Sequence, residues 1–244
     1  MTQRVLVIGA SRGLGLEFVR QYREAGDEVL ATARDAAGVA RLQALGAQAH
    51  VLDVSRPGAV ETLVPVLAAQ PVDVAVYVAG VFPAANAHVA PDQAEFDRAM
   101  HTNVWGAMQA LVALGPQVRP HDSSASASGH ARPGHAEPGH FRPGRFVFIS
   151  SEMAHIGSVD GSDAWVYRAS KAALNMAVAA AQRDWPALCL VALSPGWVQT
   201  DMGGSAAPLT PAFSVRSMRD TIARLGDAQR GAFLNHDGQA FDGW

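Results

Sequence analysis

Hydrophobic and polar positions alternate between two kinds of segment along this chain. Short runs rich in valine, leucine and alanine are apolar at consecutive positions, as strands buried on both faces of a sheet are. The pattern predicts such strands at 4–8, 28–33, 49–53, 73–78, 145–150 and 188–193. The longer amphipathic segments between them predict helices at 13–25, 35–45, 57–69, 92–114, 164–184 and 211–225.

The order of these elements predicts the fold class. Parallel strands need a crossover between them, and a helix between each two strands supplies it. We therefore expect an α/β protein, a single doubly wound Rossmann domain over 1–244 with a central parallel sheet flanked by helices on both faces. A chain of 244 residues that is 49% hydrophobic can bury one such core. Ligands of doubly wound sheets bind beyond the carboxyl ends of the strands.

Composition narrows the classes of partner. The formal net charge of -3 provides no broad electropositive face, so we expect neither nucleic acid nor membrane as a partner. No apolar run approaches the length of a membrane span, and a strand at 4–8 leaves no room for a secretory signal, so we expect a cytoplasmic protein. Cys189 is the only cysteine, which excludes a disulfide within the chain.

A glycine-rich turn follows the first predicted strand. Gly9, Gly13 and Gly15 have the spacing GxxxGxG and lie directly before a predicted helix. Glycines at this place permit a tight turn and bring backbone N–H groups and the helix N-terminus against a pyrophosphate. Tight packing alone also explains a glycine-rich turn, but the position between strand and helix favours a dinucleotide site.

The residues that follow the second and third strands indicate which dinucleotide binds. The second strand ends at Ala33, without the acidic residue that holds the adenosine ribose in many such folds, and Arg34 comes next. Arg12 and Arg34 together suit a 2′-phosphate, so NADP(H) is favoured over NAD(H). A solvated surface charge is the alternative for either arginine. Asp53 ends the third strand and is placed to reach the adenine amino group.

A second motif carries candidate chemistry. Tyr167 and Lys171 are four residues apart on a predicted helix and therefore lie on one face. A nearby ammonium lowers the pKa of a phenol, which makes tyrosine a usable general acid or base. Lys171 is also the only lysine in the chain. Ser150 and Ser151 end the fifth strand and can bring a hydroxyl to the same cleft, although a cap or turn explains such a pair equally well.

Together these motifs resemble the short-chain dehydrogenase/reductase family, from Val5 to Trp244, and most of all its C-factor-like and sniffer-like carbonyl reductases. The resemblance implies that Tyr167 exchanges a proton with the substrate, that Lys171 holds the nicotinamide ribose, that Ser151 binds the carbonyl and that Asn103 orders a relay water. The implied catalytic residues are Asn103, Ser151, Tyr167 and Lys171. The implied cofactor-binding residues are Gly9, Ser11, Arg12, Gly13, Leu14, Gly15, Arg34, Asp53, Val54, Ala79, Gly80, Asn103, Tyr167, Lys171, Pro195, Gly196, Val198 and Thr200.

The resemblance implies an oxidoreductase that transfers hydride between NADP(H) and a carbonyl or alcohol substrate, assembled as a homodimer or homotetramer. Two features depart from the family. Val78 stands where an asparagine is usual, and Ser151 lies further before Tyr167 than is common. An NADP(H)-binding regulatory or signalling protein with little turnover is the alternative, and Val78 favours it.

Apolar and aromatic residues flank the expected catalytic positions. They indicate an apolar, partly aromatic substrate pocket, while ordinary packing is the alternative for most of them. These residues are Phe82, Pro83, Met153, His155, Trp165, Trp197 and Met202.

A repeat, GHARPGHAEPGHFRPGR at 129–145, spaces three histidines evenly, His130, His135 and His140. The repeat precedes the fifth strand, whereas Ser151 follows it, and six strand residues at about 3.3 Å each separate the two by roughly 20 Å. Serine, glycine, proline and histidine dominate 117–144, so we predict a disordered insert there. Metal binding or a subunit contact by the histidines is the alternative. We expect no metal site in the domain.

Overall fold

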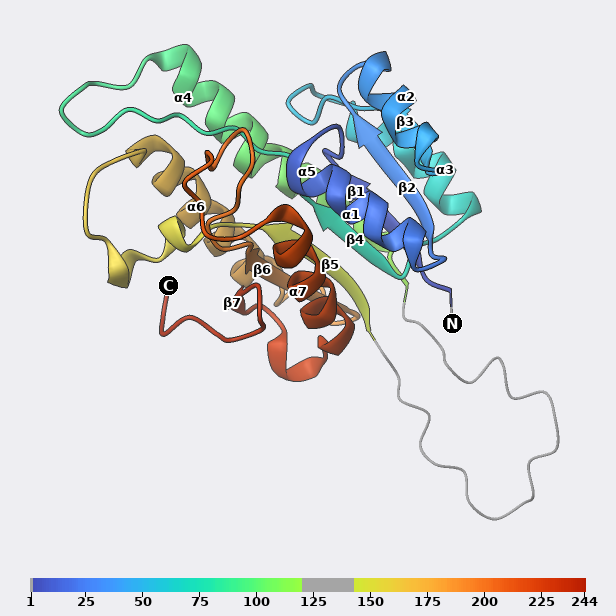
Figure 1. The fold of residues 1–244 in the computed structure, drawn as a ribbon. Helices are drawn as coiled ribbons and strands as arrows, with labels where there is room; N and C mark the ends of the chain where they lie inside the picture. The colour runs from blue at the N-terminus through green and yellow to red at the C-terminus, as the bar shows by residue number, and fades with distance from the viewer. Residues whose placement is uncertain (1, 120–142) are drawn as a thin grey trace, which may run out of the picture.

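A parallel sheet of seven strands runs through the described part of the computed structural model, residues 2–119 and 143–244 (Figure 1). The strand order is β3-β2-β1-β4-β5-β6-β7, and every neighbouring pair is parallel. The strands are β1 Arg4–Ile8, β2 Glu28–Ala33, β3 Gln48–Val51, β4 Val74–Tyr77, β5 Gly144–Ile149, β6 Leu188–Ser194 and β7 Phe233–Asn235. The predicted fold class is confirmed.

Helices connect the strands and cover both faces of the sheet. They are α1 Gly13–Glu24, α2 Ala36–Ala44, α3 Val64–Ala69, α4 Gln93–Met100, α5 Gly106–Leu114, α6 Trp165–Ala181 and α7 Pro211–Arg224. Alternate side chains of a strand point to opposite faces, and β1 divides its residues in this way. Leu6 and Ile8 join a core cluster with α3, α5 and α6, while Val5 and Val7 join another with α1, α2 and α7.

Three elements differ from the sequence-based prediction. The helix expected at 57–69 begins with a 3-10 turn, Val60–Leu63, and becomes α-helical at Val64. The helix expected at 92–114 is divided into α4 and α5 by a π-helical turn, His101–Trp105. Strand β7 was not predicted, because three residues are too few to show a hydrophobic period.

The ends of the predicted insert are ordered where the structure describes them. Gln117 closes a 3-10 turn, Val118 forms a parallel bridge with Val72, and Gly144 begins β5. The regular structure therefore reaches further into 117–144 than the composition indicated. His130, His135 and His140 lie outside the described residues.

The described residues contain neither a membrane-spanning helix nor a cluster of metal-binding side chains. Within 2–119 and 143–244, no helix has both the length and the apolar character needed to span a bilayer. In the same residues, no three side chains of His, Cys, Asp or Glu are grouped as a metal ion would require.

Candidate functional site

A cavity of about 390 Å³ opens at the carboxyl edge of the sheet. This is the edge at which doubly wound sheets bind ligands. The predicted site residues that line it are Gly9, Ser11, Arg12, Gly13, Leu14, Arg34, Asp53, Val54, Ala79, Gly80, Tyr167, Lys171, Pro195 and Thr200. The predicted residues that are not part of its lining are Gly15, Asn103, Ser151, Gly196 and Val198. Its lining also includes Met202, which was expected around the substrate, and Ser150, which was a candidate for the same cleft. Further lining residues, for which no site role was predicted, are Leu52, Ser55, Val78, Val81, Arg98, Thr102, Ile149 and Asp201.

The glycine turn between β1 and α1 depends on glycine at each of its three positions. Gly9 has φ +87°, and a Cβ there would lie 2.6 Å from the Ala79 nitrogen on the neighbouring strand end. A Cβ at Gly15 would lie 2.4 Å from the Gly9 carbonyl oxygen. Gly13 has φ +53°. The absence of a Cβ at Gly9 and Gly15 therefore lets β1, the end of β4 and the start of α1 approach one another closely, and Gly9 and Gly13 line the cavity.

The first turn of α1 suits an anion. It contains no acidic residue, and the Arg12 side chain at the N-cap makes no capping hydrogen bond to the helix. The positive end of the helix dipole therefore meets no negative side chain within this turn. The arrangement fits the pyrophosphate of a dinucleotide, as the glycine spacing predicts.

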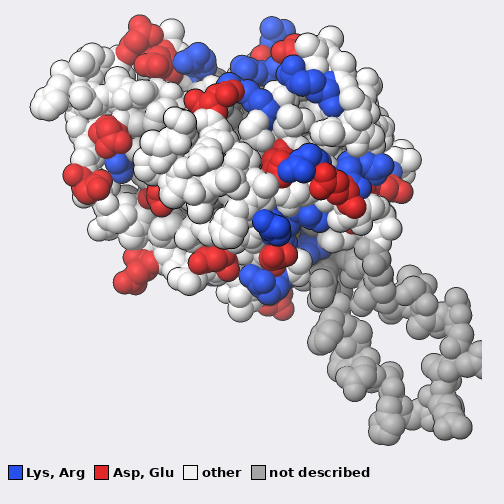
Figure 2. Space-filling model, in the orientation of Figure 1, with Lys and Arg blue, Asp and Glu red and all other residues white. Residues whose placement is uncertain are grey.

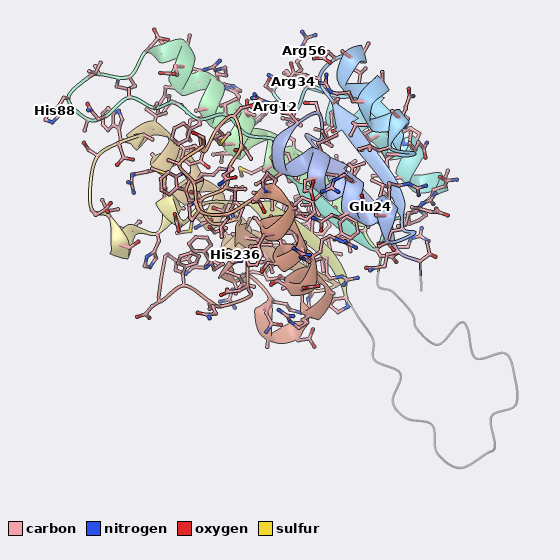
Figure 3. The ribbon with its side chains drawn as sticks, viewed as in Figure 1. Arg12, Glu24, Arg34, Arg56, His88 and His236 are labelled. Carbon is pink, nitrogen blue, oxygen red and sulfur yellow. The ribbon has the colours of Figure 1, made fainter. Side chains whose placement is uncertain are left out.

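Arginines gather beside this turn. Arg12 and Arg34 both line the cavity, and Figure 3 shows them near one another with Arg56 above. Figure 2 shows positive and negative side chains interspersed over this face, with several positive ones where these arginines lie. Arg12 Nη1 also forms an ion pair with Asp201 Oδ2 at 3.0 Å, which joins the glycine turn to the segment after β6.

Asp53 lies at the same end of the cavity as an ionised acceptor. Partial burial acts to raise the pKa of its carboxyl group, but two hydrogen bonds from Ser55 and the charges of Arg56 and Arg34 outweigh that effect and lower it. Ser55 donates from its backbone nitrogen at 3.1 Å and from its hydroxyl at 2.6 Å. A carboxylate in this state can accept hydrogen bonds, and the predicted contact of Asp53 with an adenine amino group stays a prediction.

The opposite end of the cavity is formed by α6 and the end of β5. Tyr167 and Lys171 are 6% and 4% exposed, and the ammonium nitrogen of Lys171 lies 5.7 Å from the centre of the Tyr167 ring. The Ser151 side chain lies close enough to the Tyr167 hydroxyl to lower its pKa. It also caps the 3-10 turn Glu152–Ala154 by accepting from the Met153 nitrogen at 3.2 Å. The cap interpretation of this serine therefore applies, and its predicted role at the substrate carbonyl stays a prediction.

The structure does not give Tyr167 the lowered pKa that the motif predicts. Burial raises the pKa of Tyr167 to about 12, and the only opposing effect is the hydrogen bond with Ser151. The Lys171 ammonium is directed at the Ile149 carbonyl, to which it donates at 2.7 Å. Burial lowers the pKa of Lys171 to about 8.

Asn103 is fully buried in the π-helical turn. Its side-chain oxygen accepts from the Val81 nitrogen at 2.9 Å, and its nitrogen donates to the Val81 carbonyl and to Ser170 Oγ. Ser170 in turn donates to the Tyr167 carbonyl. The side-chain amide thus braces α6 against the segment after β4, and the predicted water-ordering role stays a prediction.

Val78 replaces a side-chain amide, but its backbone keeps the connection between strands. The backbone nitrogens of Val78 and Ala79 both donate to the Ile8 carbonyl, at 2.9 and 3.0 Å. The Val78 side chain packs against the core that β1 shares with α1. The end of β4 is therefore held beside the glycine turn without the usual asparagine.

Two of the residues expected around a substrate make contacts that the sequence did not indicate. Phe82 packs edge-on against the Tyr167 ring, with centroids 4.8 Å apart. His155 is bonded to Ser158 Oγ and to the Asp242 carbonyl, so it ties the loop after Ser151 to the segment after β7.

The chain is similar to one protein family and to solved structures of carbonyl reductases. The family described as short chain dehydrogenase matches residues 3–127. C-signal of Myxococcus xanthus is 41% identical over 96 residues, and this alignment spans 38% of the chain but only 58% of C-signal. Carbonyl reductase Sniffer of D. melanogaster is 28% identical with a TM-score of 0.84 and 100% coverage of both chains. A carbonyl reductase from Pseudomonas aeruginosa, solved in complex with NADP, is 26% identical with a TM-score of 0.78 and the same coverage.

Proposed function

Since the chain belongs to the short-chain dehydrogenase family, we propose that it is an NADP(H)-dependent oxidoreductase that interconverts a carbonyl compound and an alcohol. The observation that carries the proposal is the cavity itself. One end is lined by a glycine turn with two arginines, and the other end by a buried tyrosine and the only lysine. The NADP complex of the P. aeruginosa carbonyl reductase supports the choice of cofactor.

The residues present fit this cofactor. The first-turn N–H groups of α1 would hold the pyrophosphate, Arg12 and Arg34 the 2′-phosphate, and Asp53 the adenine amino group. Lys171 would hold the nicotinamide ribose at the other end of the cavity. When bound, NADPH supplies a hydride to the carbonyl carbon.

The side chains of this protein would act on the substrate oxygen, by binding it and by transferring a proton to it. Ser151 and Tyr167 carry neighbouring hydroxyl groups, which bind the carbonyl oxygen by hydrogen bonds. As negative charge develops on that oxygen, the Tyr167 hydroxyl transfers its proton to it and the alcohol forms. In the reverse direction the Tyr167 oxygen accepts that proton. A pKa raised to about 12 keeps Tyr167 protonated near neutrality, which suits reduction.

The test removes one hydroxyl. Tyr167→Phe keeps the ring against Phe82 but loses the proton donor, so NADPH oxidation with a panel of aldehydes, ketones and quinones should fall by on the order of a hundredfold or more. The dissociation constant of NADPH, measured by fluorescence titration, should stay close to that of the wild type. Reduction by Tyr167→Phe at the wild-type rate would contradict the assignment.

A second candidate function is an NADP(H)-binding signalling protein with little turnover. The resemblance to C-signal favours it. The same panel of carbonyl compounds distinguishes an enzyme from a signalling protein, because a signalling protein would bind NADPH but oxidise it with none of these compounds.

The proposal also includes a small-molecule carbonyl or alcohol substrate and assembly as a homodimer or homotetramer.

A further inference from the structure

The carboxyl end of β5 is bonded to α6 at successive residues. Lys171 Nζ donates to the Ile149 carbonyl at 2.7 Å, and the Ser151 side chain lies close enough to Tyr167 to lower the pKa of its hydroxyl. Both interactions involve residues that the proposed reaction already uses.

A third interaction lies between these two on the strand and involves no residue with an assigned role. Ser150 Oγ donates to Asn175 Oδ1 at 2.6 Å, and both side chains are 2% exposed. Tyr167, Lys171 and Asn175 are spaced four apart and therefore follow one face of α6. Ile149 and Ser150 are thus hydrogen-bonded to successive turns of the helix, and Ser151 lies beside a third.

The chemistry of the amide fixes the direction of this bond. An amide oxygen only accepts, so the single hydroxyl proton of Ser150 is committed to Asn175. Ser150 also lines the cavity, where it consequently presents lone pairs alone. The pair therefore determines both the position of the strand end and the polarity of one part of the cavity wall.

The other polar group of the Asn175 side chain is unfavourable for stability. Its Nδ2 atom is buried and has no hydrogen-bond partner among the described residues. An unsatisfied buried donor costs free energy that an apolar side chain of similar volume would avoid. The amide is thus poorly explained by stability, and better explained by the geometry that it imposes on Ser150.

We propose that Asn175 is a positioning residue, which through Ser150 holds the end of β5 in register with α6 so that the Ser151 and Tyr167 hydroxyls meet. The inference rests on the proposed function, because it concerns the alignment of the groups that bind the substrate oxygen. It assigns no direct contact between Asn175 and substrate or cofactor.

The experiment uses Asn175→Leu, Ser150→Ala and the double variant of the full chain. Small misplacements of reacting groups cost up to about a hundredfold in rate, so kcat for carbonyl reduction should fall by on the order of tenfold in each single variant. The double variant should be no worse than the poorer single variant, since both remove one interaction. The NADPH dissociation constant should change by less than about threefold.

A control and a second readout separate positioning from loss of fold. Thr221→Val removes a partly buried side-chain hydrogen bond of 2.8 Å from α7 to the His236 carbonyl, away from the cavity, and should leave kcat unchanged. The hydrogen bond from Ser151 lowers the pKa of Tyr167, so misalignment should raise that pKa further. The rising limb of the pH profile for alcohol oxidation should then move to higher pH in Asn175→Leu and Ser150→Ala only.

The outcomes are distinguishable. If kcat per NADPH-binding site and the pH profile of Asn175→Leu match the wild type, or if the two single effects multiply in the double variant, the inference is wrong. If none of the carbonyl compounds in the panel supports NADPH oxidation by the wild type, the proposed function fails instead. The alignment is then tested by ultraviolet titration of Tyr167, taken as the difference between each protein and its Tyr167→Phe counterpart. An unchanged titration in Asn175→Leu overturns the inference.

Discussion

Lys171 and Tyr167 experience the same physical effect at the scale of single residues. Both are buried, and burial disfavours the charged form of each, so the pKa of the lysine is lowered to about 8 and that of the tyrosine is raised to about 12. At neutral pH the lysine is still charged and the tyrosine still neutral. The cavity therefore contains one buried cation whose cost to stability depends on pH.

We expect Lys171→Met to remove that dependence. The ordinary pKa of 10.5 falls to about 8 on folding, so the wild type loses stability as pH drops from about 10.5 to about 8. At 1.36 kcal/mol per unit, the loss is about 3 kcal/mol. The difference in unfolding free energy between variant and wild type, measured by urea denaturation across this range, should change by that amount. Turnover should be lost, and parallel stability curves for the two proteins would contradict the prediction.

Cofactor choice is also decided by single residues. Arg34→Ala removes a guanidinium that would bind the 2′-phosphate, and hydrogen bonds to charged groups contribute about 1.5–3 kcal/mol. NADPH should bind roughly tenfold to a hundredfold more weakly, whereas NADH, which has no 2′-phosphate, should bind as before. Isothermal titration with both dinucleotides measures this. Arg41→Ala, an exposed position on the neighbouring helix α2, is the matched control and should change neither affinity.

At the scale of elements, the glycine turn is built by contact between strand ends. Gly9 combines a positive φ with a gap too small for any Cβ beside Ala79. Gly26 has a similar φ of +84°, but no atom lies within 4 Å of a Cβ placed there. A side chain at Gly26 would therefore meet backbone strain alone, whereas one at Gly9 would meet both backbone strain and steric overlap.

Gly26→Ala should cost about 1–2 kcal/mol of unfolding free energy, the cost of a left-handed residue with a Cβ. Gly9→Ala should cost more, because β1 and β4 must also separate. It should weaken NADPH binding as well, whereas Gly26→Ala should not. Urea denaturation and fluorescence titration measure the two effects, and equal costs at both positions would rule out the packing argument.

Sequence patterns predicted most elements because buried parallel strands are uniformly apolar and their helices are amphipathic. They missed interactions between distant segments. Nothing local indicates that Asp201 pairs with Arg12, that Arg98 of α4 lines the cavity, or that Ser150 is bonded to Asn175. The spacing from Tyr167 to Lys171 and on to Asn175 was a usable signal for the last of these. The raised pKa of Tyr167 was missed because a local sequence pattern does not show how deeply the phenol is buried.

For the molecule as a whole, the two edges of the sheet have different roles. The cavity lies at the carboxyl edge, while the chain on either side of the undescribed residues meets at the amino edge. A Cβ at Gly144 would lie 3.0 Å from the Arg119 carbonyl oxygen, so these two flanks are already neighbours. Val118 and Arg119 are held there by contacts with Val72.

Deleting 121–141 should therefore leave the fold and the NADPH-dependent activity nearly unchanged. The flanks need only a short connection, and shortening a loop that closes nearby ends has a small entropic effect. Thermal unfolding and the carbonyl panel test this in the full chain and the deletion variant. A large loss of activity would show that residues 121–141 reach the cavity in the same or a neighbouring molecule.

The solitary lysine gives the protein a convenient property for experiment. Lys171 is the only side-chain amine in the chain, it lines the cavity, and burial lowers its pKa to about 8. An amine-selective label would consequently modify one side chain, at a rate set by how often the cavity admits the reagent. The rate at which Lys171 is labelled, followed by mass spectrometry of the peptide that contains it, thus reports cavity opening without an engineered probe. A ligand that fills the cavity should slow this labelling.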